Sequence, residues 1–296
     1  MPALLLLLGI AVAALAHPAA AADGELLGTL RKVHDTGVIT LGYREASVPF
    51  SFRDPAGRPV GYSIDLCNEI VDDIASELDN QAIEVKYKPV TAESRIPALQ
   101  SGEIDLECGS TTSNHTRQKQ VAFSPVFFVA GTKLLVRRGS HINSYRDLRG
   151  KTLVVTAGTT NEATIRALDE KESLGIDIIV AKDHADSYAR LATGAADAFA
   201  TDDVLLYGLI ASSQDGADFK VVGNYLSYEP YGLMFRKDDP GLADVVGSTF
   251  RRLADDRELV RLYDRWFQKR LPNGELLGIP MSPQLEEIFH LLGLPD

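Results

Sequence analysis

This 296-residue chain has only two cysteines and six histidines, and its positive charges are fewer than its negative ones. The two cysteines and six histidines show none of the spacings of a metal site, and no nucleophile–base pair of an enzyme stands out. Neither a metal nor another cofactor is therefore expected. Lys and Arg number 30 against 41 Asp and Glu, for a net charge of −11. This balance argues against binding to nucleic acid, which needs a basic face. Any anionic ligand must be held by a local cluster of Arg or His side chains.

Long apolar runs are confined to the first 22 residues. Met1–Ala22 is nearly all Leu, Ala, Val and Ile and ends in four alanines, which predicts a secretory signal peptide over 1–22, although the usual positive residues at its start are missing. A transmembrane anchor is the alternative. No cysteine lies near the expected cleavage point, and no later stretch is apolar enough to span a bilayer. We therefore expect an exported, periplasmic protein whose signal peptide is removed and which has no lipid anchor.

The two cysteines, Cys67 and Cys108, lie in the same half of the chain, on a predicted helix and at the end of a predicted strand. In an exported protein a disulfide between them would persist. A disulfide and two buried free thiols both stay open at this point. Neither alternative makes these residues catalytic.

The length and the apolar content of 45% suit two domains better than one. Leu99-Gln-Ser-Gly-Glu-Ile-Asp105 recurs as Leu191-Ala-Thr-Gly-Ala-Ala-Asp197, and each segment is typical of a helix, a glycine stop and a strand. An apolar strand opens each half, at 38–41 and at 152–155. These parallels predict an α/β protein with two lobes of similar build.

Two apolar runs, Phe127–Arg137 and Tyr228–Arg236, are long enough to cross from one sheet to the other. Two crossings place the second lobe within the first. We expect a discontinuous lobe 1 (28–133 and 228–296), an inserted lobe 2 (134–227) and two strands acting as a hinge.

Three hydroxyls in a row, Ser110–Thr112, follow a predicted strand, and Arg117 comes one short turn later. Hydroxyls and free N–H groups can surround a carboxylate, and an arginine can pair with it through two parallel hydrogen bonds. Arg44 stands where the first strand ends, and Arg95 stands near the start of the next short helix. Open α/β sheets bind ligands at such strand ends. Ordinary turn residues and surface charges are the alternative interpretation.

The second lobe offers a similar edge. The pattern Thr159-x-x-Glu162 is a capping box for a helix starting near Thr160, and a helix N-terminus preceded by glycine also suits an anion. His184 and Asp202 follow two other strands. Asp202 would receive an ammonium group or, alternatively, cap the next helix. A lone histidine is more often a surface residue or a core residue with satisfied hydrogen bonds.

Several motifs, in this order, resemble one family: Gly42-Tyr-Arg-Glu-Ala-Ser-Val-Pro-Phe-Ser-Phe52, Arg95-Ile-Pro-Ala-Leu-Gln-Ser-Gly102, Glu107-Cys-Gly-Ser-Thr-Thr-Ser-Asn114, Gly158-Thr-Thr160 and Ala181-Lys-Asp-His184. The chain is similar to the extracellular solute-binding proteins of polar amino acid ABC transporters (family 3), and most similar to the members that bind glutamate and aspartate. The resemblance covers about Gly28 to Leu292. It implies a two-lobed periplasmic binding protein fold, each lobe a mixed sheet flanked by helices, that closes on an L-amino acid.

The resemblance also implies ligand-binding roles. Arg117 would bind the α-carboxylate of the ligand, helped by Ser110, Thr112 and Thr160. Asp202 would pair with the α-ammonium group.

Arg44, Arg95 and His184 would surround the side-chain carboxylate of L-glutamate or L-aspartate. Ala92 departs from the family pattern, which has a serine at this position. That difference leaves one side-chain hydrogen bond, and the preference between aspartate and glutamate, open.

The family further implies an inner-membrane ABC permease as partner, and we expect a monomer that is not an enzyme. A dehydratase-like enzyme on the same scaffold is the alternative, with Glu107, His115 or His184 as acid or base. A periplasmic amino acid sensor is another.

Overall fold

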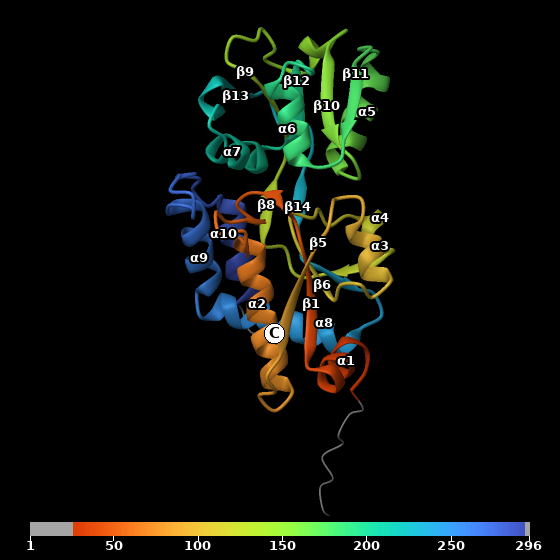
Figure 1. Ribbon diagram of the computed structural model, residues 1–296, viewed down its shortest axis with the longest axis vertical. Helices are drawn as coiled ribbons and strands as arrows, with labels where there is room; N and C mark the ends of the chain where they lie inside the picture. The colour runs from red at the N-terminus through yellow and green to blue at the C-terminus, as the bar shows by residue number, and fades with distance from the viewer. Residues whose placement is uncertain (1–25, 294–296) are drawn as a thin grey trace, which may run out of the picture.

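Residues 26–293 are described by the computed structural model, in which they form two lobes stacked along the long axis of the molecule (Figure 1). The predicted signal peptide, 1–22, lies outside the described residues. Within 26–293, no helix combines the length and the apolar character needed to cross a membrane.

Lobe 1 is built on a five-stranded sheet of order β5-β1-β6-β15-β7. The first three strands are parallel, and β15 runs antiparallel to both of its neighbours. The strands are β1 (Val38–Tyr43), β5 (Glu84–Pro89), β6 (Leu106–Cys108), β7 (Val121–Phe123) and β15 (Met234–Arg236). A small sheet of β2 (Ala46–Ser47), β3 (Ser51–Arg53) and β4 (Pro59–Val60) lies on the side facing the other lobe (Figure 1).

Among the described residues, lobe 1 has seven α-helices: α1 (Gly28–Thr36), α2 (Tyr62–Glu77), α3 (Arg95–Gln100), α4 (His115–Gln118), α8 (Pro240–Asp255), α9 (Glu258–Tyr263) and α10 (Pro283–Leu292). In α2 the apolar positions fall at helical spacing, so one face, including Leu66, Ile70 and Ile74, is buried. The Thr91 hydroxyl accepts a hydrogen bond from the Ser94 N–H at 3.1 Å, as the side chain of an N-cap residue does, and α3 begins at Arg95.

Lobe 2 repeats the plan with a sheet of order β11-β10-β12-β9-β13. Its strands are β9 (Thr132–Arg137), β10 (Thr152–Thr156), β11 (Asp177–Ala181), β12 (Ala198–Asp202) and β13 (Phe219–Val222). Its α-helices are α5 (Thr160–Glu172), α6 (His184–Ala192) and α7 (Asp203–Ser212). The α7 helix lies on the side of lobe 2 that faces lobe 1 (Figure 1).

The repeated sequence motif has the same structure in both lobes. Gly102 and Gly194 adopt left-handed φ angles of 76° and 80°, which a residue with a side chain rarely tolerates. The aspartate three residues later then bonds to the opening strand of its own sheet. Asp105 accepts from the Thr40 N–H at 2.8 Å, and Asp197 accepts from the Thr152 N–H at 2.9 Å.

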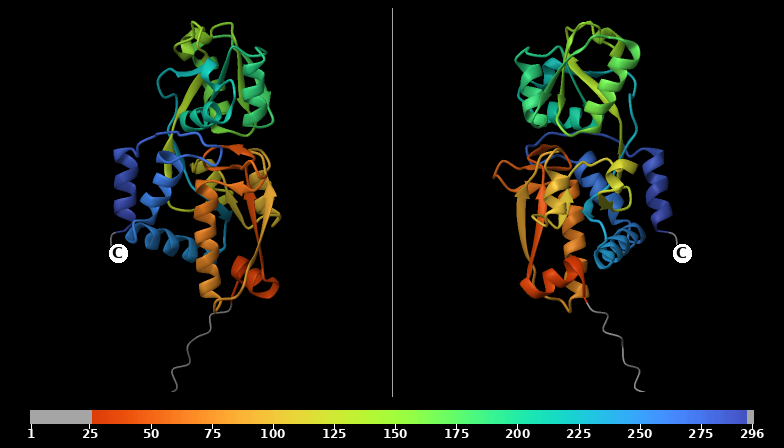
Figure 2. Two further views of the ribbon diagram at one scale, coloured as in Figure 1. Left: turned by 60° about the vertical axis from the view of Figure 1, so that its left-hand side comes forward. Right: turned by 90° about the vertical axis from the view of Figure 1, so that its right-hand side faces the viewer.

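Two short antiparallel strands, β8 (Phe128–Ala130) and β14 (Glu229–Tyr231), connect the lobes (Figure 2). Aromatic side chains hold them against lobe 1: the Phe50 ring lies 4.9 Å from the Phe128 ring and 5.1 Å from the Tyr231 ring, between centroids. The expected boundary at 133/134 falls inside β9, which pairs with β12 over residues 132–136.

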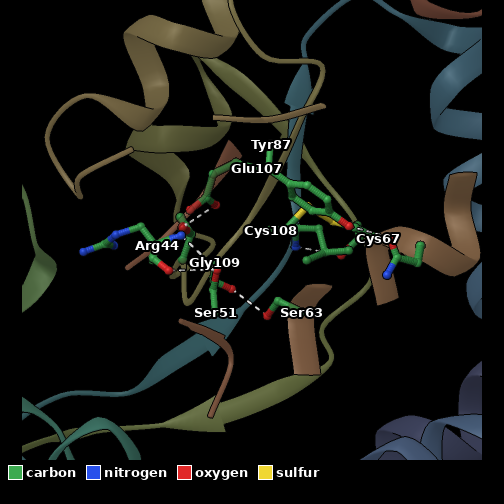
Figure 3. Close-up of a disulfide and its surroundings, with 12 residues drawn as sticks. Arg44, Ser51, Ser63, Cys67, Tyr87, Glu107, Cys108 and Gly109 are labelled. Carbon is green, nitrogen blue, oxygen red and sulfur yellow. Dashed lines mark hydrogen bonds between the residues drawn. A yellow bond between two sulfur atoms is a disulfide. The ribbon is translucent and has the colours of Figure 1, made fainter. Parts of the chain in front are cut away.

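Cys67 and Cys108 form a disulfide, which decides the alternative left open by the sequence. Both residues are fully buried, so the bond ties α2 to the end of β6 inside lobe 1 (Figure 3). A covalent loop of 41 residues stabilises the folded state by roughly 4 kcal/mol in the chain-entropy model. The bond also fixes the residue just before the loop that carries Ser110 and Thr112.

Candidate ligand-binding site

Seven of the eight predicted site residues line one narrow cavity between the lobes. Lobe 1 and lobe 2 both contribute to its wall, which consists of Arg44, Arg95, Ser110, Thr112, Thr159, Thr160, Asn161, His184, Asp202 and Leu205. The eighth predicted residue, Arg117, lies beside this wall, because its guanidinium contacts the backbone of Thr112.

Arg44 follows β1, and its backbone N–H donates to the Ser51 hydroxyl at 2.8 Å (Figure 3). Its side chain is only 3% exposed, and its guanidinium has no hydrogen-bond partner among the described residues. Burial, and secondly the charge of Arg95, lowers the pKa of Arg44 to about 10, so the group stays charged at neutral pH. A buried cation without a partner is costly, and an anion in the cavity would relieve that cost.

Arg95 opens α3 and is equally buried. One Nη donates to the Thr111 hydroxyl and lies 3.9 Å from Glu107 Oε1, while its Nε has no partner among the described residues. Burial lowers the pKa of Arg95, and the Glu107 carboxylate opposes that shift. The Nε of Arg95 therefore remains able to donate a hydrogen bond to a ligand, although the Glu107 carboxylate partly neutralises the charge of Arg95.

The loop after β6 is held close to Glu107 and Arg44. A Cβ on Gly109 would lie 2.2 Å from Glu107 Oε1, so a larger residue there would have to displace the Glu107 side chain. The Gly109 carbonyl accepts a hydrogen bond from the Ser63 hydroxyl at 2.8 Å (Figure 3). Next in the chain, the Ser110 hydroxyl is buried without a hydrogen-bond partner among the described residues. A ligand atom in the cavity would satisfy it.

Arg117 lies in α4, whose first turn is capped by Asn114. Its guanidinium donates to the carbonyl of Thr112 at 2.9 Å and to the carbonyl of Gly158, in the other lobe, at 3.1 Å. Burial, and secondly the charge of Arg95, lowers the pKa of Arg117 to about 9, which leaves it charged at neutral pH. Arg117 thus bridges the two lobes as well as adding positive charge at the edge of the cavity.

Asp202, at the end of β12, stands at the N-cap position of α7, but its side chain makes no capping hydrogen bond, so the alternative role as a capping side chain is wrong. One carboxylate oxygen accepts from Asn161 Nδ2 at 2.7 Å, and the other accepts from the Tyr231 hydroxyl. Burial, and secondly the charge of Glu229, raises the pKa of Asp202 to about 7. A positively charged partner would stabilise the ionised form.

His184 is the first residue of α6, and its Nδ1 lies 2.9 Å from the Thr156 hydroxyl. Burial, and secondly the charges of Arg44 and Arg95, holds the pKa of His184 well below its usual value. The imidazole is therefore neutral at neutral pH. It has a hydrogen-bonded partner in the core and also lines the cavity, where it adds no charge.

Glu229, which the sequence did not single out, joins the lobes at the hinge. Its Oε2 accepts from the hydroxyls of Thr112 at 2.6 Å and Thr160 at 2.7 Å. Each hydroxyl has one proton to donate. While both donate to Glu229, neither side chain can donate to a ligand, which leaves the backbone N–H groups at the start of α5 for that role.

The sequence did not mark Thr159, Asn161 or Leu205 as lining residues either. Asn161 donates to Asp202 and to the Thr132 hydroxyl, at 2.7 and 2.6 Å. Its position directly after the predicted helix start was a usable signal. Leu205 gave none, because it belongs to the apolar sequence of α7.

Within the part of the chain that the structure describes, no group of three or more His, Cys, Asp or Glu side chains could hold a metal ion. The cavity instead combines positive side chains on lobe 1 with a carboxylate on lobe 2. This arrangement is suited to a small molecule with negative groups at one end and a positive group at the other.

Comparison with known proteins agrees with this geometry. Residues 39–269 match the family model of bacterial extracellular solute-binding proteins, family 3. A curated relative from Pseudomonas aeruginosa, an L-glutamate/L-aspartate-binding protein, is 43% identical over 94% of this chain and 92% of its own length. The glutamate/aspartate import solute-binding protein of Escherichia coli is 41% identical over 97% of this chain and 93% of its own length.

Among solved structures, a mutant of ArgBP from T. maritima is similar with a TM-score of 0.73 and 30% identity, covering 82% of this chain and all of that one. The ancestral amino acid-binding protein AncCDT-1, a precursor of cyclohexadienyl dehydratase, is similar with a TM-score of 0.68 and 30% identity over 81% of this chain and 99% of that one. The family model covers most of the chain. The protein therefore belongs to the bacterial extracellular solute-binding proteins, family 3.

Proposed function

We propose that this protein binds L-glutamate or L-aspartate between its lobes and delivers it to an inner-membrane ABC permease. The observation that carries the proposal is the buried Arg44 guanidinium, which has no hydrogen-bond partner among the described residues and lines the same cavity as Arg95 and Asp202. The similarity to the glutamate- and aspartate-binding relatives supports the same choice of ligand.

The charges of the ligand and of the cavity are complementary. An acidic amino acid carries two carboxylates and one ammonium group. Arg44 and Arg95 suit the side-chain carboxylate, with the neutral His184 as a further hydrogen-bonding group. Asp202 suits the ammonium group, and its raised pKa would fall when that cation arrives. Removing one partner of such a buried pair costs roughly 3–5 kcal/mol.

The α-carboxylate is assigned to Arg117, the Ser110 hydroxyl and the backbone N–H groups near Thr160. Because the Thr112 and Thr160 hydroxyls are bound to Glu229, they act in this proposal by holding the lobes together around the ligand. A dissociation constant near 1 μM requires only about −8 kcal/mol, so part of the gross interaction energy remains available for closure.

The protein acts, in this proposal, as a periplasmic monomer after removal of residues 1–22. Since all of β9 pairs within the sheet of lobe 2, we place the division between the lobes at the hinge strands β8 and β14.

Catalysis is a second candidate, favoured only by the similarity to a precursor of a dehydratase. The neutral His184 and the buried Glu107 are its potential acid and base. Incubation of the purified protein with L-glutamate, followed by analysis for a new product, separates the two. We expect the amino acid to be recovered unchanged.

Isothermal titration of the purified protein with single amino acids tests the proposal. L-Glutamate or L-aspartate is expected to bind with a dissociation constant on the order of 1 μM, whereas L-lysine and L-leucine are expected to give no heat of binding. Binding of L-lysine, or of none of the four, would overturn the assignment of Arg44 and Arg95.

A further inference from the structure

The lobes meet at a second place, away from the polar contacts of Arg117 and Glu229. There α7 of lobe 2 lies against the segment that joins β2 to β3 in lobe 1 (Figure 1). Val204 and Leu205 of α7 are buried in the same apolar cluster as Val48 and Phe50 of lobe 1. Gly208 lies on the same face of the helix, three and four residues further along.

At this contact the backbone of Gly208 lies directly against the backbone of Val48. A Cβ built on Gly208 would lie 2.1 Å from the Val48 carbonyl oxygen and 2.8 Å from its carbonyl carbon. Both are backbone atoms of the other lobe, so no side-chain rotation relieves the overlap. In the closed arrangement only a glycine hydrogen fits in this place.

We propose that Gly208 determines how far the lobes close, and that a side chain at this position holds the cleft open. The inference rests on the proposed function, since it assumes that closure completes the site. The Leu205 side chain, one turn before Gly208, forms part of the cavity wall. A shift of α7 away from Val48 therefore also moves one wall of the cavity away from lobe 1.

Gly208 is a better test position than the other inter-lobe glycine, Gly158. A Cβ on Gly158 would lie 2.8 Å from Glu93 Cα, but Gly158 also has a φ of 72°. A substitution at Gly158 would strain lobe 2 whether the cleft is open or closed. Gly208 lies inside the regular helix α7, where alanine is favoured over glycine in the open form.

The experiment compares Gly208→Ala with Gly247→Ala in the full protein. Gly247 is also inside a helix, α8, where the nearest atom to an added Cβ is Arg251 Nη1 at 3.6 Å, so alanine fits. Both variants are expected to unfold, without ligand, at the wild-type temperature or about 2–4 °C higher. Only Gly208→Ala is expected to weaken L-glutamate binding, by roughly 5- to 150-fold, the range typical of an overpacked contact.

Small-angle X-ray scattering gives a second measurement. Wild type and Gly247→Ala are expected to become more compact when L-glutamate is added, and Gly208→Ala to do so incompletely. Wild-type affinity in Gly208→Ala would overturn the inference, and so would a lowered unfolding temperature of its unliganded form, which would assign the contact to folding. If the wild type itself binds neither L-glutamate nor L-aspartate, the proposed function fails first, and this inference fails with it.

Discussion

The two lobes share one framework but contribute different chemistry to the site. Their sheets have corresponding strand orders, and Asp105 and Asp197 bond to the opening strand of each sheet in the same way. The guanidinium groups of Arg44, Arg95 and Arg117, however, all come from lobe 1. Lobe 2 supplies Asp202 and neutral hydrogen-bonding groups.

The lobes also differ in how they are stabilised. The chain's two cysteines form a bond inside lobe 1, next to the loop that carries the hydroxyls of the site. Lobe 2 positions its groups by hydrogen bonds, such as that from Asn161 to Asp202. Because the arginines belong to lobe 1 and Asp202 belongs to lobe 2, neither lobe has the complete set of charges for a dicarboxylic amino acid. The site is complete only when the lobes meet.

The largest expected effect on affinity comes from Arg117→Ala. It removes positive charge from lobe 1 and the hydrogen bond to the Gly158 carbonyl of lobe 2. We expect L-glutamate binding to weaken by roughly 100- to 1,000-fold, as measured by isothermal titration. Arg166→Ala is the matched control, because Arg166 pairs with Glu162 on the exposed surface of α5. Near-normal binding by Arg117→Ala would refute the assignment of the α-carboxylate.

Removal of the disulfide tests the difference in stabilisation. The double variant Cys67→Ser/Cys108→Ser is expected to lose roughly 4 kcal/mol of unfolding free energy. Hydrogen exchange is expected to rise mainly in α2 and β6 and to change little in the sheet of lobe 2. Equal loss of protection in both lobes would show that the bond does not act locally.

A smaller effect is expected from Arg44→Ala. The affinity for L-glutamate should fall by about 10- to 100-fold, because hydrogen bonds to charged groups contribute roughly 1.5–3 kcal/mol. The preference for L-glutamate over L-glutamine is expected to fall as well, since a neutral amide no longer leaves the Arg44 charge unpaired. Titrations with both ligands measure this ratio. The exposed Arg53, which pairs with Glu45, provides the control Arg53→Ala. An unchanged ratio would place the side-chain carboxylate elsewhere.

The pH dependence of binding tests the acidic group of lobe 2. The pKa of Asp202 without ligand is about 7, and an ammonium partner lowers it, so binding must release a proton below pH 7. Affinity is expected to be constant above pH 7 and to fall about tenfold per pH unit towards pH 5. Asp202→Asn should bind more weakly and lose this slope. A wild-type profile that is flat from pH 5 to 8 would contradict the role of Asp202.

The Asp202 carboxyl also makes the stability of the unliganded protein depend on pH, in the direction opposite to that of ligand binding. Its pKa in the folded state is raised above the unfolded value, so its favourable contribution is complete at low pH and is lost as the pH rises through about 7. Ligand binding and unliganded stability should therefore depend on pH in opposite directions in this range.

The sequence predicted the two-lobed frame well because the signals are local. Strand periodicity and a glycine that ends a helix, such as Gly102 or Gly194, depend on a few neighbouring residues. Parallel strands align their carboxyl ends, so Arg44, His184 and Asp202 were expected at sheet edges, and they line one cavity.

The remaining features depend on partners that are distant in sequence. Glu229 accepts hydrogen bonds from Thr112 and Thr160, which lie 117 and 69 positions away in the sequence. No local pattern marks a carboxylate in a crossing strand as a link between the lobes. The neutral state of His184 is set by burial beside two arginines, which composition does not show. The contact of Gly208 with Val48 exists only once both lobes are folded and closed.

A crystal structure of the protein with L-glutamate tests the central claim most directly. We expect the side-chain carboxylate between Arg44 and Arg95 of lobe 1 and the ammonium group against Asp202 of lobe 2. A ligand bound in the cleft with its ammonium group away from Asp202, or with its side-chain carboxylate away from both arginines, would contradict it.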